Sequence, residues 1–357
     1  MSTTNLDAYD LSQINLEGLI REDVMDKIWD ISNVPLEFTS RAGSGTHSNP
    51  YFSWRVDMLQ APVTDGQLID GQVVTTEANN TKNGRRVGTY SEIRGKRVEV
   101  STRATEVNTI GFANALAENI SRRQIELRRD IESTVLSNNP SIAGTDSVAS
   151  QTAGLAAWLS NTNVDGDSDP GNVHRESGGA DGGWDAVATD SLVAAATPGT
   201  TPVALTETNI RDVVQSIYEK GGEPSVLMST PAVKRRISEY LFTDAARIAT
   251  MTNESPGGSA PERKAQGSVD LFISDYGALS LIPNRLQPAF DTGNDIAYIL
   301  DMKYLSLSYL QGYRVETLAK DALSSNRFMS VDVALKCSNW DALGAVCDID
   351  ATAPMTF

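Results

Sequence analysis

The longest periodic pattern in the sequence lies in residues 105–137 and predicts one amphipathic helix. Its apolar and small residues keep the three-and-four spacing of a single buried stripe, and they are Ile110, Ala113, Ala117, Ile120, Leu127, Ile131 and Val135. Asn138, Asn139 and Pro140 follow and end the pattern. A helix over this range would span about 50 Å, roughly twice the length that a compact domain needs. The fold must accommodate this length.

Four arginines lie on the polar side of the predicted helix, and they are Arg122, Arg123, Arg128 and Arg129. Glu118 with Arg122, and Arg128 with Glu132, have the four-residue spacing of helical ion pairs. One interpretation is a nucleic-acid-binding patch, and the other is a solvated, ion-paired or intersubunit face. The chain carries 46 acidic residues against 30 basic ones, a formal net charge of −16, which argues against neutralising many phosphates. We therefore favour the ion-paired or intersubunit face.

Two alternating segments precede the helix and predict a long two-stranded excursion. They are residues 49–59 and 88–104, separated by a polar stretch that contains the turn Asn83-Gly84. Basic residues outnumber acidic ones here. The basic residues that we assign to contacts between copies are Arg85, Arg86, Arg94, Lys96, Arg97 and Arg103.

The first 40 residues are acidic and predict an arm rather than a core. Glu22, Asp23 and Asp26 lie in the middle of this arm. Because the basic excursion and the acidic arm have opposite charge, one interpretation is that they attract each other between copies of the chain. The other interpretation is a hairpin whose charges only keep it soluble.

The rest of the chain predicts a loop followed by mixed helices and strands. Residues 141–203 are rich in Gly, Ser, Asp, Thr and Ala, with one apolar patch at residues 154–159. Beyond them, Ile210, Val214, Ile217 and Tyr218 give the buried side of a helix, and Thr230 and Pro231 begin another. Several strands follow, and the last alternating one, residues 327–337, predicts a half-buried strand. The fold class is α+β.

The sequence contains weak candidates for a metal or catalytic site. Asp165, Asp167, Asp169 and Glu176 have the spacing of a calcium loop, but Pro170 stands where that loop requires glycine. We favour a polar turn over a metal site and expect no cofactor. His47 and His174 lie in predicted loops away from any nucleophile motif, so we expect no enzyme.

Cys337 and Cys347 stand ten residues apart, without a second cysteine pair or a histidine cluster. This spacing supports neither a zinc site nor a disulfide framework, so we interpret both as reduced thiols. No run of 18 apolar residues is present, and the chain does not open on a signal-peptide pattern, so we expect neither a membrane span nor secretion by that route.

Several consecutive blocks resemble the major capsid proteins of tailed bacteriophages with the Hong Kong 97-like fold. The blocks run nearly from end to end, and they are PLEFTSRAG, NPYFSWRVDML, EIRGKRVEVSTRATEV, ANALAENISRRQIELRRDIESTVLSNN, TAGLAAWLSNTNV, VDLFISDYGALSLIPNRLQP and ILDMKYLSLSYLQGYRVETLAKDALSSNRFMSVDVALKCSNWDALGAVCDI. Their order is similar to that in the shell proteins of some podophages with prolate heads. The blocks taken together in this order identify the family more specifically than any single block does.

The resemblance implies a role for each segment. Residues 1–45 would form an N-terminal arm, 46–104 an extended hairpin called the E-loop, and 105–140 the spine helix of a peripheral domain. Residues 141–205 would be an insertion loop, 206–318 an axial domain, and 319–357 the strands that return to the peripheral domain.

The resemblance also implies the function and the partners. The chain would assemble into hexamers and pentamers of an icosahedral or prolate head shell, in the cytoplasm of a bacterial host, and would become part of the virion. It would touch packaged double-stranded DNA weakly and without specificity. A separate scaffolding protein, a portal and a decoration protein are expected partners, and a membrane is not. We expect no covalent crosslink between subunits.

Three alternatives remain open from the sequence. An encapsulin-type nanocompartment shares the fold but encloses enzymes instead of a genome. A DNA-associated structural protein would use the basic run of residues 82–103. A hydrolase would assemble its site from the acidic loop of residues 164–186.

Overall fold

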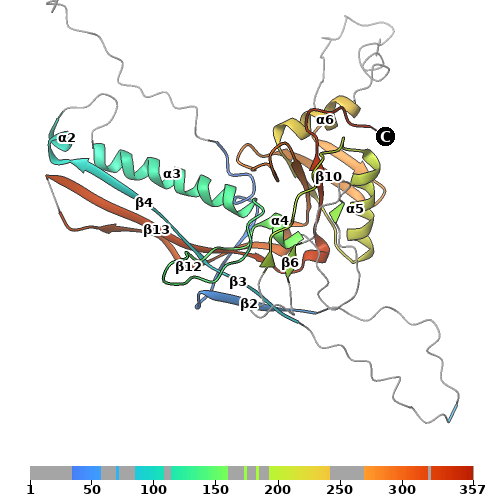
Figure 1. Cartoon of the computed structure of the whole chain (residues 1–357), viewed down its shortest axis with the longest axis horizontal. Coiled ribbons are helices and arrows are strands. Elements are labelled where there is room, and N and C mark those ends of the chain that lie inside the picture. The colour runs from blue at the N-terminus through green and yellow to red at the C-terminus, as the bar shows by residue number, and fades with distance from the viewer. Residues whose placement is uncertain are drawn as a thin grey trace, which may run out of the picture.

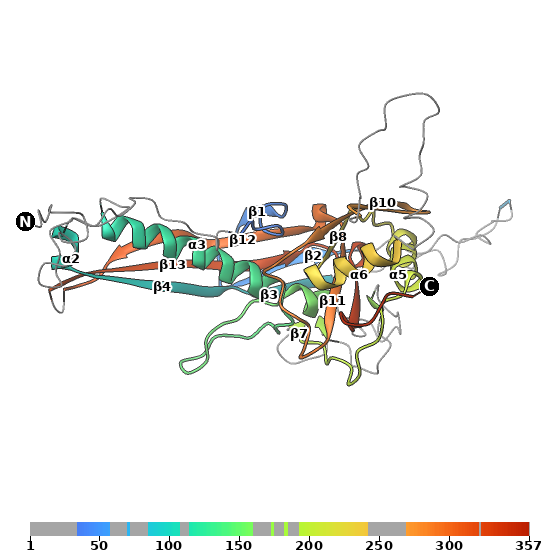
Figure 2. The ribbon, with the colours of Figure 1, turned by 90° about the horizontal axis from the view of Figure 1, so that it is seen from above.

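The computed structural model describes residues 34–57, 70–71, 85–107, 114–159, 173–174, 182–184, 193–241, 269–320 and 323–356. They form a long four-stranded sheet that carries one helix and a six-stranded sheet that carries two (Figure 1). Seen from above, the long helix runs along the four-stranded sheet, and the six-stranded sheet lies at one end of it (Figure 2). The α+β class predicted from the sequence is confirmed.

The four-stranded sheet, called the platform below, has the strand order β1-β12-β13-β4. The strands are β1 (Gly43–Thr46), β12 (Leu305–Thr317), β13 (Ser324–Cys337) and β4 (Glu92–Ser101). β13 pairs antiparallel with both β12 and β4, and β1 lies parallel to β12. The long strands give the platform its elongated shape.

Helix α3 (Ala115–Val135) lies on the platform and is shorter than predicted. Asn114 has extended backbone angles, and its side-chain oxygen accepts hydrogen bonds from the N–H groups of Leu116 and Ala117. This capping starts the helix at that point. A separate helix, α2 (Thr102–Glu106), comes earlier, and residues 108–113 lie outside the described part. α3 therefore spans about 32 Å instead of about 50 Å.

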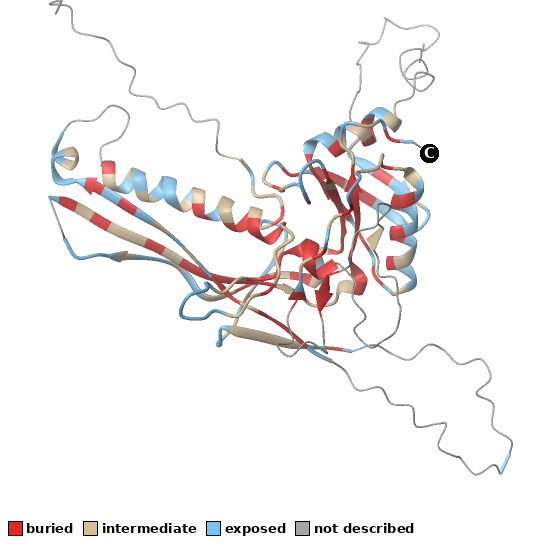
Figure 3. Ribbon diagram, in the orientation of Figure 1, coloured by how far each residue is buried: buried red, intermediate tan, exposed pale blue. Residues whose placement is uncertain are grey.

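Only part of the predicted apolar stripe of α3 is buried. Leu127, Ile131 and Val135 belong to the core, whereas Ala117 is exposed and Ile120 is half-buried. Figure 3 shows the same gradient, with burial increasing along α3 toward the six-stranded sheet. The N-terminal half of the helix packs mainly against a small cluster that includes Val98 and Val100 of β4, so it is less deeply buried than the C-terminal half.

The six-stranded sheet has the order β5-β14-β11-β8-β10-β9. Its strands are β5 (Val173–His174), β14 (Gly344–Ile349), β11 (Asp295–Leu300), β8 (Val226–Ser229), β10 (Gly277–Pro283) and β9 (Leu271–Ser274). β5–β14 and β8–β10 are parallel pairs, and the others are antiparallel.

Helices α5 (Glu207–Glu219) and α6 (Pro231–Leu241) pack on the six-stranded sheet. The Thr206 side chain accepts a hydrogen bond from the Asn209 N–H and caps α5. Ile210, Val214 and Ile217 are buried as predicted. Tyr218, predicted to be buried, is 52% exposed and packs against Tyr276 of the β9–β10 turn, with ring centroids 5.0 Å apart. It is the last apolar residue of the helix and extends beyond the sheet.

The shorter elements complete the described fold. The hairpin strands are β2 (Tyr51–Val56) and β3 (Arg85–Tyr90), and a second small pair is β6 (Gly183–Trp184) and β7 (Val193–Ala194). The short helices are α4 (Leu155–Leu159), η3 (Met302–Tyr304) and η4 (Trp340–Ala342).

Strand pairing groups the chain differently from the predicted segments. β4 was predicted in the hairpin segment and β12 in the 206–318 segment, but both lie in the platform. β14 was predicted to return to the helix-bearing domain, but it pairs with β11 in the six-stranded sheet. An alternating pattern indicates which face of a strand is buried and not which strand is its partner. The domain boundaries themselves stay predictions.

One core cluster joins the two sheets. It contains residues of α3, α4, the platform and the inner face of the six-stranded sheet. At its centre the Tyr298 hydroxyl of β11 donates a hydrogen bond of 2.6 Å to the carbonyl of Leu136, the C-cap residue of α3. Tyr298 is fully buried, and this burial raises the pKa of its phenol well above the ordinary value. The helix end and the six-stranded sheet are thus fixed to each other.

Gly154 provides a test of how tightly this core is packed. A Cβ atom there would lie 2.0 Å from the Ser137 carbonyl oxygen, immediately before the fully buried helix α4. We expect Gly154→Ala to lower the free energy of unfolding by about 3 kcal/mol, because backbone must move. Gly312→Ala in β12 is the control, since its Cβ would have no atom within 4 Å. Urea unfolding measures both, and equal stabilities would contradict the packing.

Candidate assembly surfaces

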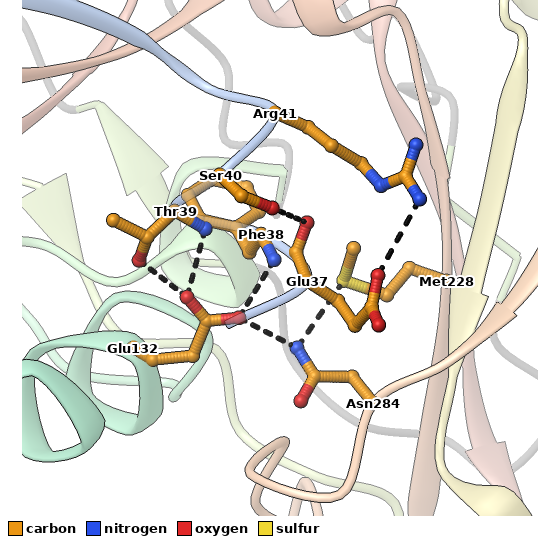
Figure 4. A network of polar contacts seen from close by, with 8 residues as sticks. All are labelled: Glu37, Phe38, Thr39, Ser40, Arg41, Glu132, Met228 and Asn284. Atoms are coloured by element: carbon orange, nitrogen blue, oxygen red, sulfur yellow. Dashed lines mark hydrogen bonds and ion pairs between the residues drawn. The ribbon is translucent and has the colours of Figure 1, made fainter. Parts of the chain in front are cut away.

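Glu132 of α3 anchors the base of the N-terminal arm (Figure 4). Its carboxylate is fully buried and accepts hydrogen bonds from the backbone N–H of Phe38 (2.7 Å) and of Thr39 (2.8 Å). The Thr39 hydroxyl and the side-chain amide of Asn284 (2.8 Å) also donate to it. Asn284 follows β10. One carboxylate therefore joins the arm base, the spine helix and the six-stranded sheet.

The arm base is shaped to meet this carboxylate. Residues 37–41 form a tight turn in which Ser40 N–H donates to the Leu36 carbonyl and Ala42 N–H to the Phe38 carbonyl. The turn leaves the amides of Phe38 and Thr39 free to point at Glu132, and it places the Phe38 ring in the core. An ionised carboxylate can be buried when donors surround it in this way.

The sequence did not identify this anchor. Glu132 has the spacing of an ion-pair partner for Arg128, but its side chain turns toward the arm instead. Arg128 lies over the Tyr313 ring of β12, 5.3 Å from its centroid. The only signal is the place of Glu132 beside the apolar stripe, next to Ile131. This place in the sequence predicts a partly buried side chain, but it does not predict which residues form hydrogen bonds with it.

A series of aromatic rings attaches the β2–β3 hairpin to the body. His47 stacks on Phe52, and Phe52, Trp54, Trp158 and Trp340 follow at centroid distances of 5.1, 5.3, 5.4 and 6.4 Å. The rings come from the start of the hairpin, from α4 and from η4. Such neighbouring rings add to the stability of their burial. The base of the hairpin is therefore held firmly.

Polar contacts hold the second strand of the hairpin. The Thr89 hydroxyl donates to Ser141 Oγ (3.2 Å) and accepts from the Ala153 N–H (3.2 Å), and Thr89 is fully buried. The Tyr90 N–H donates to the same Ser141 Oγ (3.1 Å). Both strands of the hairpin thus have fixed positions on the body.

The hairpin base covers one end of the platform on the side opposite α3. Asp332 and Ala334 of β13, predicted to be solvent-facing, are buried there. Lys336 Nζ lies 5.8 Å from the Phe52 ring centroid and 5.9 Å from that of Trp54. The prediction of a half-buried strand is therefore wrong at the inner end of β13, because the hairpin base packs on its second face.

Most of the predicted contact residues of the basic run have partners within the chain. Arg94 pairs with Glu92, Arg97 with Glu99 (3.2 Å), and Lys96 with Asp130 (2.7 Å) and Glu126 (3.6 Å) of α3. The Lys96 pairs lie between the platform and the helix, within one subunit. Arg86 donates to Ser53 Oγ (3.0 Å) across the hairpin.

Of the remaining arginines that were predicted to contact other copies, some form ion pairs within the chain and others are exposed. On α3, Arg122 pairs with Glu118 (2.9 Å) and Arg123 with Glu126 (2.6 Å). Arg103 is exposed on α2. Of Arg85, only the backbone at the start of β3 is described, opposite Val56. Contacts of these residues with another copy stay predictions.

Several sequence candidates lie outside the described residues, namely Glu22, Asp23 and Asp26 of the arm and Asp165, Asp167, Asp169 and Glu176 of the weak metal candidate. Within the described residues no group of three His, Cys, Asp or Glu side chains could hold a metal ion. Cys337 and Cys347 are buried, no disulfide joins them, and burial raises the pKa of the Cys337 thiol. No described helix is long and apolar enough to cross a membrane.

A family model described as SU10 major capsid protein matches residues 2–350. The chain belongs to this family. It is therefore a capsid shell protein and a component of a virion. Members of such families assemble into shells of many copies, so this SU10-type capsid protein is a homo-oligomer. The expected family and function are confirmed.

Solved structures support the fold. The alignment with the capsid of a native GTA particle covers 93% of this chain and 96% of the GTA chain, with a TM-score of 0.53 and 12% identity. A structure from Mycobacterium phage Bobi covers 96% and 98%, with a TM-score of 0.52 and 12% identity. The SrpI encapsulin complex from Synechococcus elongatus covers 99% of both chains, with a TM-score of 0.51 and 12% identity. No curated protein sequence matches the chain significantly.

No described segment of the capsid protein packs on the outer part of one platform face. Lys96, Val98 and Val100 of β4 face α3, so the alternate residues of the strand point to the opposite side. Among these, Ile93 is 68% exposed, and the Phe328 ring lies across Gly95. At the far tip, Leu323 is 86% exposed. A bare sheet face with apolar side chains is a candidate contact surface.

Removing the charge of Glu132 tests the arm anchor. In Glu132→Gln an amide NH₂ would face hydrogen-bond donors that now meet a carboxylate oxygen. We expect a loss of about 3 kcal/mol in the free energy of unfolding, together with faster amide hydrogen exchange at Phe38 and Thr39. Glu118→Gln, on the exposed part of the same helix, should cost less than about 0.5 kcal/mol. Unchanged exchange at the two amides would contradict the anchor.

The pH dependence of the hairpin base follows from His47. Both ring nitrogens are buried, and neither has a hydrogen-bond partner in the part of the chain that the structure describes. Burial lowers the His47 pKa, and the Asp332 carboxylate partly offsets this. The folded chain thus binds this proton less readily than the unfolded chain, so stability contributed by neutral His47 is lost as the pH falls below about 6.5.

Thermal unfolding at pH 7 and pH 5.5 measures this effect. His47→Phe should lose less stability than the wild type between the two values, whereas Asp332→Asn should lose more, because it removes the charge that favours the imidazolium. Lys336, the other charge beside Phe52, is present in all three proteins. Identical losses in the three proteins would rule out the role of His47.

Proposed function

We propose that this capsid protein closes hexameric and pentameric rings of a phage head by placing its hairpin and arm on neighbouring subunits. The observation that carries the proposal is the firm attachment of the hairpin base. The aromatic series and the Thr89 contacts fix β2 and β3, and 28 residues, 57–84, lie between these strands in the sequence. A long hairpin with few apolar residues is not stable alone.

The uncovered platform face supports the same proposal. It offers Ile93 and Phe328 on a sheet whose charges are balanced locally, since Arg97 pairs with Glu99 and Arg314 with Glu316 (2.7 Å). Such a face favours a partner that brings apolar and backbone contacts. We assign it to the hairpin of the next subunit.

The arrangement is a head-to-tail contact, in which different surfaces of two copies meet. Contacts of this kind form closed rings when the rotation between copies closes. Each subunit would be held through its hairpin, its arm and its platform face, so the total buried area would exceed the ~1,600 Å² of a standard protein pair. Many modest contacts would stabilise the shell together.

We infer that the enclosed genome is double-stranded DNA that the shell touches weakly and without specificity. The negative net charge and the intrachain pairing of most described arginines support weak contact with phosphates. The role is structural, and we propose no catalytic activity. Portal, scaffolding and decoration proteins, and assembly in the cytoplasm of a bacterial host, stay predictions from the resemblance to tailed-phage capsid proteins.

The encapsulin alternative is supported by fold likeness alone. The SrpI encapsulin and the phage capsids have similar TM-scores and identities to this chain, so the fold does not separate them. The match of the family model over residues 2–350 favours the capsid. No observation favours the DNA-associated protein or the hydrolase.

Shortening the hairpin tests the proposal. Val56 and Arg85 are paired in register, so residues 57–84 can be replaced by Asn-Gly, which forms a two-residue turn. We expect the variant to fold with a melting temperature close to that of the wild type but to form no closed shells in electron micrographs. A variant with Ile93→Glu should also fold normally, but it should assemble poorly. Normal shells from the shortened chain would refute the role of the hairpin.

A further inference from the structure

Three arginines of α2 and α3 lack an acidic partner in the described chain. Arg103, Arg128 and Arg129 have no carboxylate within 4.0 Å among the described residues, whereas Arg122 and Arg123 on the same helix as Arg128 are paired. Arg103 stands alone on α2 at the platform tip. Arg128 and Arg129 are adjacent, so their unpaired charges add up at one place.

The two adjacent arginines are prepared to receive an acidic group. Arg128 lies over the Tyr313 ring, 5.3 Å from its centroid, and this contact restricts the position of its guanidinium. Arg129 is only partly exposed, and its Nε is shielded from solvent without a hydrogen-bond partner among the described residues. A shielded donor without an acceptor is unfavourable. A carboxylate beside it would satisfy both the hydrogen bond and the charge.

The arm of the same chain begins next to this pair. Glu132, which holds Phe38 and Thr39, lies one helical turn after Arg128 and Arg129, about 5 Å along the axis. Residues 1–33, which precede the described chain, contain seven acidic residues against two basic ones. Asp30 stands eight residues before Phe38, and an extended chain of that length reaches as far as about 26 Å.

We propose that Arg128 and Arg129 form a docking site for the acidic stretch of residues 22–30 in the arm of the same chain. Its acidic members are Glu22, Asp23, Asp26 and Asp30. The Glu132 anchor tethers this stretch beside the arginines, which gives it a high effective concentration there. The contact directs the arm along α3 as it leaves its base. It forms within one subunit, so of the arm only the residues before Glu22 would take part in the ring contacts proposed above.

Two other occupants are less favoured. A DNA phosphate would compete with an acidic tether already in place and would have to approach a chain of net charge −16. The arm of a second copy has the same chemistry but lacks the tether. Both are separate outcomes of the test below.

Hydrogen exchange of the unassembled full-length chain at low salt tests the proposal. We expect peptides that cover residues 20–33 to exchange about fivefold slower in the wild type than in Arg128→Glu/Arg129→Glu, because two charge pairs are lost. Asp26→Lys/Asp30→Lys alone should show the same loss. Combining both pairs of substitutions should restore the protection, since the charges are exchanged.

Controls separate docking from general effects. Arg103→Glu changes charge at the unpaired arginine of the platform tip and should keep wild-type protection. Arg129→Gln keeps the Arg128–Tyr313 contact, and it should lose part of the protection while its melting temperature stays near that of the wild type. These measurements use free subunits, so a failure to form shells leaves their outcome unaffected.

Three results would overturn the proposal. One is equal exchange of the arm peptides in the wild type and the double arginine variant. Another is protection that rises with protein concentration, which would assign the site to the arm of a second copy. The third is salt-sensitive binding of duplex DNA by the wild type that is lost in Arg128→Glu/Arg129→Glu without any arm protection, which would assign the pair to phosphate.

Discussion

The buried Glu132 carboxylate is the interaction on which the arrangement of this capsid protein depends. A charge can be held away from water only when donors replace its hydration. Here the donors come from the arm base and from the loop after β10, two segments far apart in the sequence. Folding is therefore favourable at this point only if the spine helix, the arm base and the six-stranded sheet come together. The beginning of the arm has a fixed place for the same reason.

The hairpin is fixed by a different kind of contact on the other face of the platform. Rings from β2, α4 and η4 exclude water around its base, while the buried Thr89 hydroxyl satisfies the backbone nearby. The base of the arm and the base of the hairpin thus lie on opposite faces of one sheet. A subunit built in this way can contact one neighbour above the platform and another below it without moving its core.

Local periodicity predicted much of the secondary structure but not the tertiary partners. The three-and-four spacing located the C-terminal half of α3 and the buried side of α5, because those residues face a core directly. It failed before Asn114, where a side-chain cap starts the helix, and at Tyr218, which lies past the sheet. Alternation located β4 and β13 but not the strands with which they pair. Glu132 was missed because its partners are backbone amides, which no side-chain pattern reveals.

The distribution of ion pairs indicates what kind of force can hold copies together. Several basic side chains pair with acids two to four residues away, as Arg97 does with Glu99 and Arg122 with Glu118. Such exposed local pairs contribute little to stability and weaken in salt. They do, however, cancel the positive charge of these side chains locally, so the excess negative charge of the chain remains. In the proposed ring arrangement, apolar residues such as Ile93 would carry much of the contact between copies. Arg128 and Arg129 differ from the paired arginines because no carboxylate of the described residues lies beside them.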